Sequence, residues 1–414
     1  MKMYTTSDTK EIIDIDFNIA EKRINKLQKR ISVAFNNNDM VLVKHLQHTL
    51  LHSRYAKALA VKAVLSNDGA RKSGIDNVIW NSYNDGYNSI FSINYREYKP
   101  MPLKRTYFKH LNGKIRPLGI PTITDRAMQT LCRYALEPIA EITADDSSFA
   151  YRKNRSNKSA LMRVFNIIYN YPELTHILKI DIHSCFDNIS HEWILENIPF
   201  DERIICKMLK CGYIDNDKYH RTDKGIPQGG CLSSVLCNMT LDGIDALMYK
   251  HFEHSVKVVR YADDIVIFVD SPTFLRAEDV LSVLSDFLDE RSLKISKKKS
   301  QYGSLSDGFE FLGCNIKVTN GIITCLPKEF NIEKYMKSIY TVITSNSFTS
   351  YNALYEKLTE KIGGWFDYYN GLVPAYKLNE IEFDTIMCIH HLTGNTTLTA
   401  EISHKVFKKY TYIS

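Results

Sequence analysis

The chain has 414 residues, a formal net charge of +6, and 44% hydrophobic and 24% charged residues, which is typical of a globular protein with two or three subdomains. No signal peptide or long apolar segment is visible, and the nine cysteines form neither a CxxC pair nor an array with zinc spacing. These features argue against a secreted, membrane-spanning or zinc-finger protein. They predict a cytoplasmic protein with reduced cysteines and no membrane partner.

The first predicted elements are helices between residues 18 and 65. Apolar residues recur there at helical spacing on both sides of a polar break at 36–39, which predicts a helical hairpin. Lys22, Lys26 and Lys29 lie on its outer face, where they either contact a partner RNA or form a solvated surface. One apolar stripe before the break comprises Ile24, Leu27 and Ile31, and another after it comprises Val43, Leu46, Leu50 and Leu59.

Basic residues dominate two later stretches, 99–116 and 152–163, neither of which contains an acidic residue. Such blocks suit a polyanionic partner, although a solvated surface is the alternative interpretation. Within the first stretch, Asn112-Gly113 predicts a hairpin turn that places Lys114 and Arg116 where they could neutralise a triphosphate. A helix is expected over residues 126–142, with its apolar side chains facing inward.

An apolar run at 177–182 predicts a buried strand that carries Asp181 near its end, followed by Phe186 and by a helix near His191. From the local sequence alone, Asp181 could equally cap the following turn. Further along, GIPQGGCLSS at 225–234 predicts a glycine-rich turn that enters a helix and presents Gln228. Glycines let the backbone approach a base pair closely, and an ordinary helix-entry loop is the alternative.

Residues 256–270, VKVVRYADDIVIFVD, form two β-branched apolar runs around a polar tip and predict a β-hairpin. The tip carries Asp263 and Asp264, and a divalent cation would relieve the repulsion between their carboxylates. The alternative interpretation is an ordinary solvated turn. Together with Asp181 they could hold two Mg²⁺ ions roughly 4 Å apart, with Mn²⁺ as an alternative ion. Phosphoryl transfer needs mainly charge stabilisation and alignment, so no separate nucleophilic residue is required.

The order of these blocks resembles that of group II intron-type bacterial reverse transcriptases, and the resemblance covers nearly all of the chain. It rests on the stretches NGKIRPLGIPTITDRAMQ, SSFAYRKNRSNKSAL, KIDIHSCFDNISH, GIPQGGCLSS, RYADDIVIF, KKKS, FEFLG and GGWFDYYN. It implies an α+β right-hand polymerase with fingers, a palm whose antiparallel sheet carries the aspartates, and a helical thumb. The implied domains are a helical N-terminal extension at 1–97, fingers and palm at 98–327, the thumb at 328–375, and a short C-terminal extension at 376–414.

The resemblance also implies roles for individual residues. Asp181, Asp263 and Asp264 are expected to be catalytic and to bind Mg²⁺, with help from the backbone carbonyl of Ile182. An aromatic ring at Phe186 leaves no room for a 2′-hydroxyl, which predicts the use of dNTPs and hence DNA synthesis. The residues expected to contact the incoming nucleotide, its triphosphate or the primer are Lys114, Arg116, Phe186, Gln228 and Lys299.

The predicted function is RNA-directed DNA polymerisation on an RNA template. Few residues follow Tyr369 and no His/Cys-rich endonuclease pattern is visible, which argues against mobility by the usual cleavage route. Ser234 stands where intron enzymes commonly have proline, and Ser148-Phe149-Ala150-Tyr151 replaces their Tyr-Gly-Phe-Arg. These departures suggest a domesticated relative, and we expect an antiphage enzyme that copies a dedicated, structured noncoding RNA.

Alternatives remain open at this point. The first is an intron-encoded maturase and reverse transcriptase with a trimmed C-terminus that acts in RNA splicing. The second is an RNA-binding scaffold with a vestigial polymerase site. Keeping three carboxylates together is energetically costly, which argues against a vestigial site. An RNA-dependent RNA polymerase is disfavoured by Phe186 and the YADD tip. The sequence does not indicate the template, the priming mode, the product length or the oligomeric state.

Overall fold

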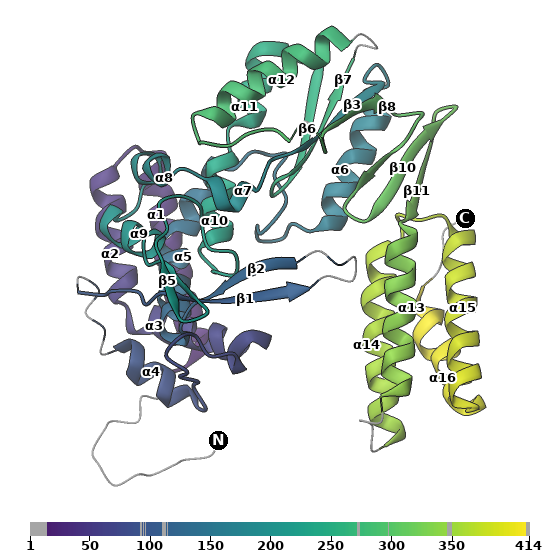
Figure 1. Ribbon diagram of the computed structural model, residues 1–414, viewed down its shortest axis with the longest axis horizontal. Helices are drawn as coiled ribbons and strands as arrows, with labels where there is room; N and C mark the ends of the chain where they lie inside the picture. Colours follow the sequence, from purple (N-terminus) through teal and green to yellow (C-terminus); the bar gives the residue numbers. More distant parts are fainter. Residues whose placement is uncertain are drawn as a thin grey trace. The chain divides into compact units, whose positions relative to one another are not determined.

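The structure, a computed structural model, describes residues 15–91, 93, 95, 97–109, 113, 115–270, 274–296, 298–345 and 350–410 (Figure 1). The chain divides into two compact units, each assembled from three separate segments. Unit 1 comprises Met1–Ala144, Ser184–Asp242 and Leu288–Leu293. Unit 2 comprises Asp145–His183, Gly243–Phe287 and Lys294–Ser414.

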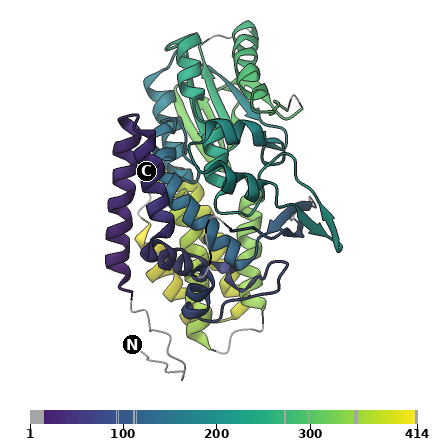
Figure 2. The ribbon, with the colours of Figure 1, turned by 90° about the vertical axis from the view of Figure 1, so that its left-hand side faces the viewer.

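Unit 1 is largely helical, and its helices α1, α2 and α3 pack on α5 (Figure 2). The predicted helical hairpin is therefore wrong in one respect, because the region holds three helices. Ser53 ends α2, and its hydroxyl accepts a hydrogen bond from the Ala56 N–H (3.4 Å) at the start of α3. The helices are α1 (Phe17–Asn36), α2 (Met40–His52), α3 (Arg54–Leu65), α4 (Tyr83–Phe91), α5 (Ile123–Thr143), α7 (Cys185–Asn188), α8 (His191–Asn197), α9 (Glu202–Leu209) and α10 (Ser233–Leu241), with a 3₁₀ turn at Asp68–Arg71.

A four-stranded sheet in the order β2-β1-β4-β5 completes the regular structure described for unit 1. Its strands are β1 (Leu103–Lys109), β2 (Ile115–Ile120), β4 (Tyr213–Asp215) and β5 (Lys218–His220). β1 and β2 run antiparallel with Lys109 opposite Ile115, so the expected hairpin is present. The predicted turn residue Asn112 lies outside the described residues.

The short segment Leu288–Leu293 returns to unit 1 late in the chain. Its Arg291 is 7% exposed, and the guanidinium Nε donates a hydrogen bond to the Thr240 carbonyl (2.8 Å). The same guanidinium lies 4.6 Å from the centroid of the Trp193 ring. These contacts anchor six residues that are distant in sequence from the rest of the unit.

Unit 2 contains a four-stranded antiparallel sheet in the order β6-β7-β3-β8. The predicted hairpin at 256–270 is confirmed as β6 and β7, and residues 265–269 of β7 are all buried. Helices α6 and α11 pack against β6. The elements are α6 (Asn157–Asn170), β3 (His176–Asp181), α11 (Ile244–Phe252), β6 (Val256–Tyr261), β7 (Asp264–Val269), α12 (Phe274–Asp289), whose last two residues are assigned to unit 1, and β8 (Gln301–Ser304).

A second sheet of unit 2, in the order β11-β10-β9, leads into a group of C-terminal helices. A tight turn follows β9, in which Leu312 (φ 45°) and Gly313 (φ 80°) both adopt left-handed backbone. The elements are β9 (Phe309–Phe311), β10 (Cys314–Thr319), β11 (Ile322–Pro327), α13 (Glu329–Thr344), α14 (Tyr351–Tyr369), α15 (Ala375–Thr393) and α16 (Thr396–Glu401), followed by a π-helical turn (Ile402–Val406) and a 3₁₀ turn (Phe407–Lys409).

Helix α13 packs on both α14 and α15, so residues on either side of position 375 share one helical group. One apolar core runs from the aspartate-bearing sheet into these helices. Phe268 of β7 meets Phe309 edge-on at 6.2 Å, and Phe366 meets Phe407 in the same manner at 4.9 Å. The domain boundaries inferred from the sequence stay predictions.

Candidate active site

Two of the predicted aspartates face each other across neighbouring strands of unit 2. Asp181 ends β3, Asp264 begins β7, and the two are direct partners in the antiparallel ladder. Side chains of such partners project from the same face, with Cβ atoms about 4.5–5.5 Å apart. Ile180 and Ile265, the next pair, are 1% and 0% exposed, so a slip of one residue would expose apolar side chains and is disfavoured.

The third aspartate, Asp263, lies at the tip of the β6–β7 hairpin. Tyr261 and Asp264 close the tip, and Ala262 between them has a φ of 57°. A left-handed alanine costs roughly 1–2 kcal/mol and persists where surrounding packing determines the backbone. Ala262 is 5% exposed, so the buried strands hold this strained turn in place.

Asp181 is held by the segment that leads into β8. Its N–H donates to Ser300 Oγ (3.2 Å), and its carbonyl accepts from the Ser296 N–H (2.8 Å). Lys299 Nζ lies 3.2 and 3.4 Å from the two Asp181 carboxylate oxygens. The structure therefore places the predicted primer-side lysine in an exposed ion pair with a predicted metal ligand.

Ile182, the predicted backbone ligand, pairs with Ile295 in an isolated antiparallel bridge. The hydrogen bonds of this bridge come from flanking residues. The His183 N–H donates to the Lys294 carbonyl, and the Ser296 N–H donates to the Asp181 carbonyl, each at 2.8 Å. The Ile182 carbonyl takes no part in the bridge, so the bridge leaves it available to a ligand.

Burial raises the pKa of Asp264, and the like charges of Asp263 and Asp181 raise it further, while Lys179 and Lys328 act in the opposite direction. Carboxylate and carbonyl oxygens are the donors that Mg²⁺ prefers, so the chemistry of this set fits the ion. Across the residues that the structure describes, no three acidic, His or Cys side chains form a ready metal cluster. The structure thus pairs Asp181 with Asp264, and the three-aspartate metal site stays a prediction.

The predicted nucleotide-contacting residues belong to unit 1, where polar side chains link β2 to the glycine-rich loop. Arg116 Nε donates to Gln228 Oε1 (2.8 Å), and Gln228 Nε2 donates to Asp187 Oδ1 (3.3 Å). The sequence did not nominate Asp187, although it directly follows Phe186. Lys114, predicted to act beside Arg116, lies outside the described residues.

Phe186 is half-buried beside the same loop. Its carbonyl accepts from the Ile226 N–H (2.7 Å), and the Gly225 N–H donates to the Ile189 carbonyl (2.8 Å). Gly225 has a φ of 80°, and a Cβ there would lie 2.6 Å from the Asp187 carbonyl oxygen. Only glycine allows this close approach, which holds the glycine-rich loop against the backbone of α7.

A cavity of about 480 Å³ opens beside this loop. Its polar lining includes Arg105, Asp187, Tyr213, Arg221, Lys224 and Gln228. The Arg105 guanidinium stacks 3.8 Å from the centroid of the Tyr213 ring, which fixes a cation at the wall. The lining carries three cationic side chains and two carboxylates, those of Asp187 and Asp223, so its net charge is positive. The cavity therefore suits an anionic ligand.

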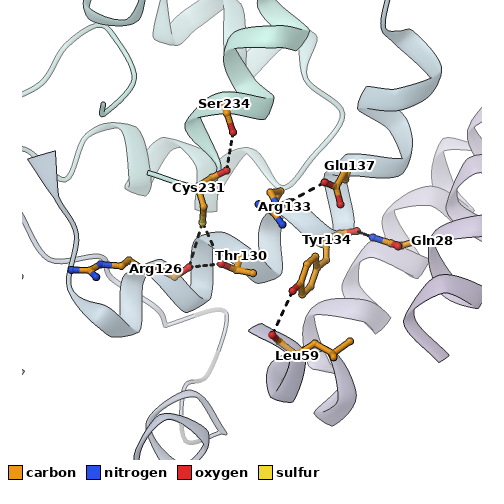
Figure 3. A network of polar contacts seen from close by, with 9 residues as sticks. All are labelled: Gln28, Leu59, Arg126, Thr130, Arg133, Tyr134, Glu137, Cys231 and Ser234. Atoms are coloured by element: carbon orange, nitrogen blue, oxygen red, sulfur yellow. Dashed lines mark hydrogen bonds and ion pairs between the residues drawn. The ribbon is translucent and has the colours of Figure 1, made fainter. Parts of the chain in front are cut away.

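Helix α5 supports the glycine-rich loop from below (Figure 3). Thr130 Oγ1 lies 3.3 Å from Cys231 Sγ, and Ser234 Oγ donates to the Cys231 carbonyl (3.2 Å). On another side of α5, the Tyr134 carbonyl accepts from Gln28 Nε2 (2.8 Å). One helix therefore connects the loop to the N-terminal helices, and burial raises the pKa of Cys231, which keeps its thiol neutral.

Residues 103–316 match the family described as "Reverse transcriptase (RNA-dependent DNA polymerase)", and residues 13–92 match "N-terminal domain of reverse transcriptase". The chain belongs to the reverse transcriptase family. This membership confirms the predicted enzyme class and the α+β right-hand polymerase fold class. The matched reverse transcriptase segment contains every candidate site residue, from Lys114 to Lys299.

Curated relatives confirm the group II intron type of this reverse transcriptase. The group II intron-encoded protein LtrA of Lactococcus lactis is 36% identical over an alignment of 205 residues that covers 46% of this chain and 33% of LtrA. Protein YkfC of Escherichia coli is 25% identical over 70% of this chain and 87% of its own length. Maturase-like protein 1 of Euglena gracilis is 24% identical over 83% of this chain and 74% of its own length. The chain thus spans a third of LtrA.

Solved structures with a similar backbone include two telomerases. That of Candida albicans, in complex with a fragment of telomeric RNA, has a TM-score of 0.43 at 13% identity and covers 76% of this chain and 63% of its own. Apo telomerase of Candida tropicalis has a TM-score of 0.43 at 12% identity and covers 74% and 64%. Among the described helices, none combines the length and apolar character needed to span a membrane.

Proposed function

We propose that this protein is an RNA-directed DNA polymerase that uses dNTPs to copy an RNA template into complementary DNA in the cytoplasm. The observation that carries the proposal is the register that pairs Asp181 with Asp264 inside the segment matched by the reverse transcriptase family. Asp263 at the adjacent tip supplies the third carboxylate. These three side chains, with the Ile182 carbonyl, would hold two Mg²⁺ ions, and Mn²⁺ could replace them.

When bound, the ions would lower the pKa of the attacking 3′-hydroxyl and stabilise charge on the triphosphate and the leaving pyrophosphate. The residues of this chain supply position and charge. Lys299 neutralises Asp181 in the ion pair described above and can contact the primer. The strained Ala262 turn sets the backbone from which Asp263 and Asp264 project.

Nucleotide binding is assigned to the unit 1 residues. Arg116 and Lys114 would contact the triphosphate, because a guanidinium and an ammonium neutralise phosphate oxygens. Gln228 would line the base-pair pocket, and its amide is oriented by Arg116 on one side and Asp187 on the other. Phe186 would lie under the incoming sugar and exclude a 2′-hydroxyl.

Primer extension on an RNA template tests both the activity and this selection. Wild-type protein should extend the primer with dNTPs and reject NTPs, and Phe186→Ala should reduce the ratio of kcat/KM for dNTP over NTP by about 10–200-fold. Phe165→Ala, on α6 of unit 2, is a control that removes a ring of the same size and should leave the ratio unchanged. An unchanged ratio in Phe186→Ala would remove the sugar-gate assignment.

For the biological role, we propose that the template is a dedicated, structured noncoding RNA and that the product acts in antiphage defence. Support comes from the sequence, where Ser234 and Ser148-Phe149-Ala150-Tyr151 depart from the intron-enzyme pattern. The test is to purify the protein from its native locus and sequence the bound nucleic acid. Complementary DNA of one adjacent RNA, lost together with phage protection in Asp263→Ala/Asp264→Ala, is the expected result.

A second candidate is an intron maturase that assists RNA splicing. It is favoured by the 36% identity to a group II intron-encoded protein and by the similarity to maturase-like protein 1. The same purification separates the two roles. Enrichment of an intron RNA whose splicing survives the double aspartate substitution would assign the maturase role and reject the defence role.

A further inference from the structure

A buried arginine lies directly before the hairpin tip of unit 2 and has no role in the functions proposed above. Arg260, at the penultimate position of β6, is 0% exposed and is the largest fully buried side chain among the described residues. A buried guanidinium loses its hydration and persists only where fixed groups of opposite charge compensate. The surroundings of Arg260 therefore indicate what it holds together.

The backbone of Arg260 is fixed by the segment at 145–149, which forms a parallel bridge beside β6. The Arg260 N–H donates to the Ser147 carbonyl (2.8 Å), and the Arg260 carbonyl accepts from the Phe149 N–H (2.9 Å). Arg152 Nη1 secures the same segment by donating to the carbonyls of Asp145 (2.7 Å) and Ser148 (2.9 Å). The end of β6 is therefore hydrogen-bonded to the 145–149 segment, which Arg152 in turn holds in place.

Asp145, at the start of the same segment, is 9% exposed and carries the charge opposite to that of Arg260. Burial raises the pKa of Asp145, and the Arg260 charge opposes this rise. The Asp145 carboxylate also accepts from the N–H groups of Gly243 and Ile244 (each 3.0 Å), at the start of α11. The 145–149 segment therefore connects β6, through the backbone of Arg260, to the start of α11, through the Asp145 carboxylate.

We propose that Arg260 is a positioning residue of the polymerase site, which fixes the end of β6 so that the strained Ala262 turn presents Asp263 beside Asp264. This inference rests on the proposed polymerase activity. In this role Arg260 acts through the backbone of the tip. Its loss should therefore affect the chemical step and the order of the tip, and it should leave nucleotide binding in unit 1 unchanged.

The test compares Arg260→Met with wild type by hydrogen exchange and by primer extension. We expect exchange at residues 261–264 to rise about tenfold or more, kcat to fall about tenfold or more, and KM for dNTP to stay within about twofold. The Mg²⁺ concentration for half-maximal rate should also rise. A folded Arg260→Met with wild-type exchange at the tip and wild-type kcat overturns the proposal.

Arg291→Met is the matched control, because it removes a buried arginine from unit 1. It should lower the melting temperature without changing exchange at 261–264 or the Mg²⁺ dependence. If Arg260→Met does not fold, Arg260→Met/Asp145→Asn also removes the opposite charge, keeps an acceptor oxygen for the Gly243 and Ile244 N–H groups, and should restore folding. That variant should keep the mobile tip and the low kcat, and wild-type values for both would contradict the proposal.

Arg260→Lys completes the series if neither variant folds, since it keeps the charge and loses the planar fork. It should lower kcat about threefold to tenfold with faster exchange at the tip, and wild-type values would reject the positioning role. A wild-type protein without polymerase activity would instead refute the proposed function. The exchange measurement would then still decide whether Arg260 orders the tip.

Discussion

Asp181 and Asp264 in unit 2 owe their positions to a β-ladder, whereas Arg116, Gln228 and Asp187 in unit 1 are connected through side chains on a strand, a loop and a short helix. A ladder fixes side-chain direction through many backbone hydrogen bonds, and a slip in register exposes apolar residues. A chain of side-chain hydrogen bonds can be broken at one link. The carboxylates should therefore tolerate changes in their neighbours better than the nucleotide-contacting residues do.

The largest effect should come from Asp264→Asn. We expect kcat to fall about 10³-fold or more, because the change removes charge where the metal ions are expected to bind. The melting temperature should rise by a few degrees, since burial raises the pKa of Asp264 and the folded state holds its charge at a cost. Primer extension and thermal unfolding at pH 7 measure the two effects. Asp307→Asn, an exposed carboxylate in unit 2, should leave kcat unchanged, and equal losses in both variants would contradict the assignment.

Gly225→Ala tests how strictly backbone contact fixes the unit 1 loop. The added Cβ would meet the Asp187 carbonyl oxygen at 2.6 Å, and the φ of 80° is strained for alanine. We expect a loss of about 2–4 kcal/mol in the free energy of unfolding, measured by denaturant titration. Gly303→Ala on β8 is the control, because no atom lies within 4 Å of its added Cβ, and it should cost no more than about 1 kcal/mol. Similar losses at both positions would mean that the close approach at Gly225 is unimportant.

Asp187→Ala removes one hydrogen bond from the series of side-chain contacts in unit 1. Without its acceptor, the Gln228 amide loses orientation and with it the contact to Arg116. We expect KM for dNTP to rise about threefold to tenfold with kcat nearly unchanged, as for the loss of one hydrogen bond. Steady-state kinetics with Asp187→Asn, which retains an acceptor oxygen, provides the comparison. A fall in kcat at constant KM would show that Asp187 acts in chemistry.

The smallest effect concerns pH and again involves unit 1. His191 Nε2 lies 2.7 Å from the Gly225 carbonyl, and burial lowers the pKa of His191. Above its ordinary pKa of about 6.5 the imidazole is neutral in both the folded and unfolded chain. Below that pH the unfolded chain binds the proton first, so folding stability should fall as pH drops toward the lower folded-state pKa. Denaturant titration between pH 7.5 and 5.5 should show a shallower loss in His191→Gln, and parallel curves would refute the linkage.

Much of unit 2 could be predicted from sequence because its signals are local. The alternation and β-branching of residues 256–269 specify a hairpin whose tip holds the two aspartates, and the run ending at Asp181 specifies its partner strand. The pairing of Asp181 with Asp264 could not be derived locally, because register depends on residues far apart in sequence. Arg260 was missed, since an arginine within an apolar run gives no sign that its charge is fully buried.

Unit 1 was harder to predict because its contacts join distant short motifs. The sequence indicated Phe186 and Gln228 separately, whereas Asp187 between them became visible only through its hydrogen bond to Gln228. The break at Ser53 was missed because no glycine or proline interrupts the helical spacing there, and a serine cap alone separates α2 from α3. The glycine-rich turn was predicted correctly because its glycines stand in the sequence itself.

The alternation of segments between the two units bears on how the chain folds during synthesis. A ribosome releases Met1–Ala144 and Ser184–Asp242 well before Leu288–Leu293, which completes unit 1. Until Arg291 is synthesised, the Trp193 ring and the Thr240 carbonyl lack the contacts that it makes in the folded protein. Synthesis of unit 2 has already begun by then, at Asp145. Neither unit can finish folding on the nascent chain before the other has started. We therefore expect the two units to complete their folding late, after synthesis of the chain, and not one after the other during synthesis.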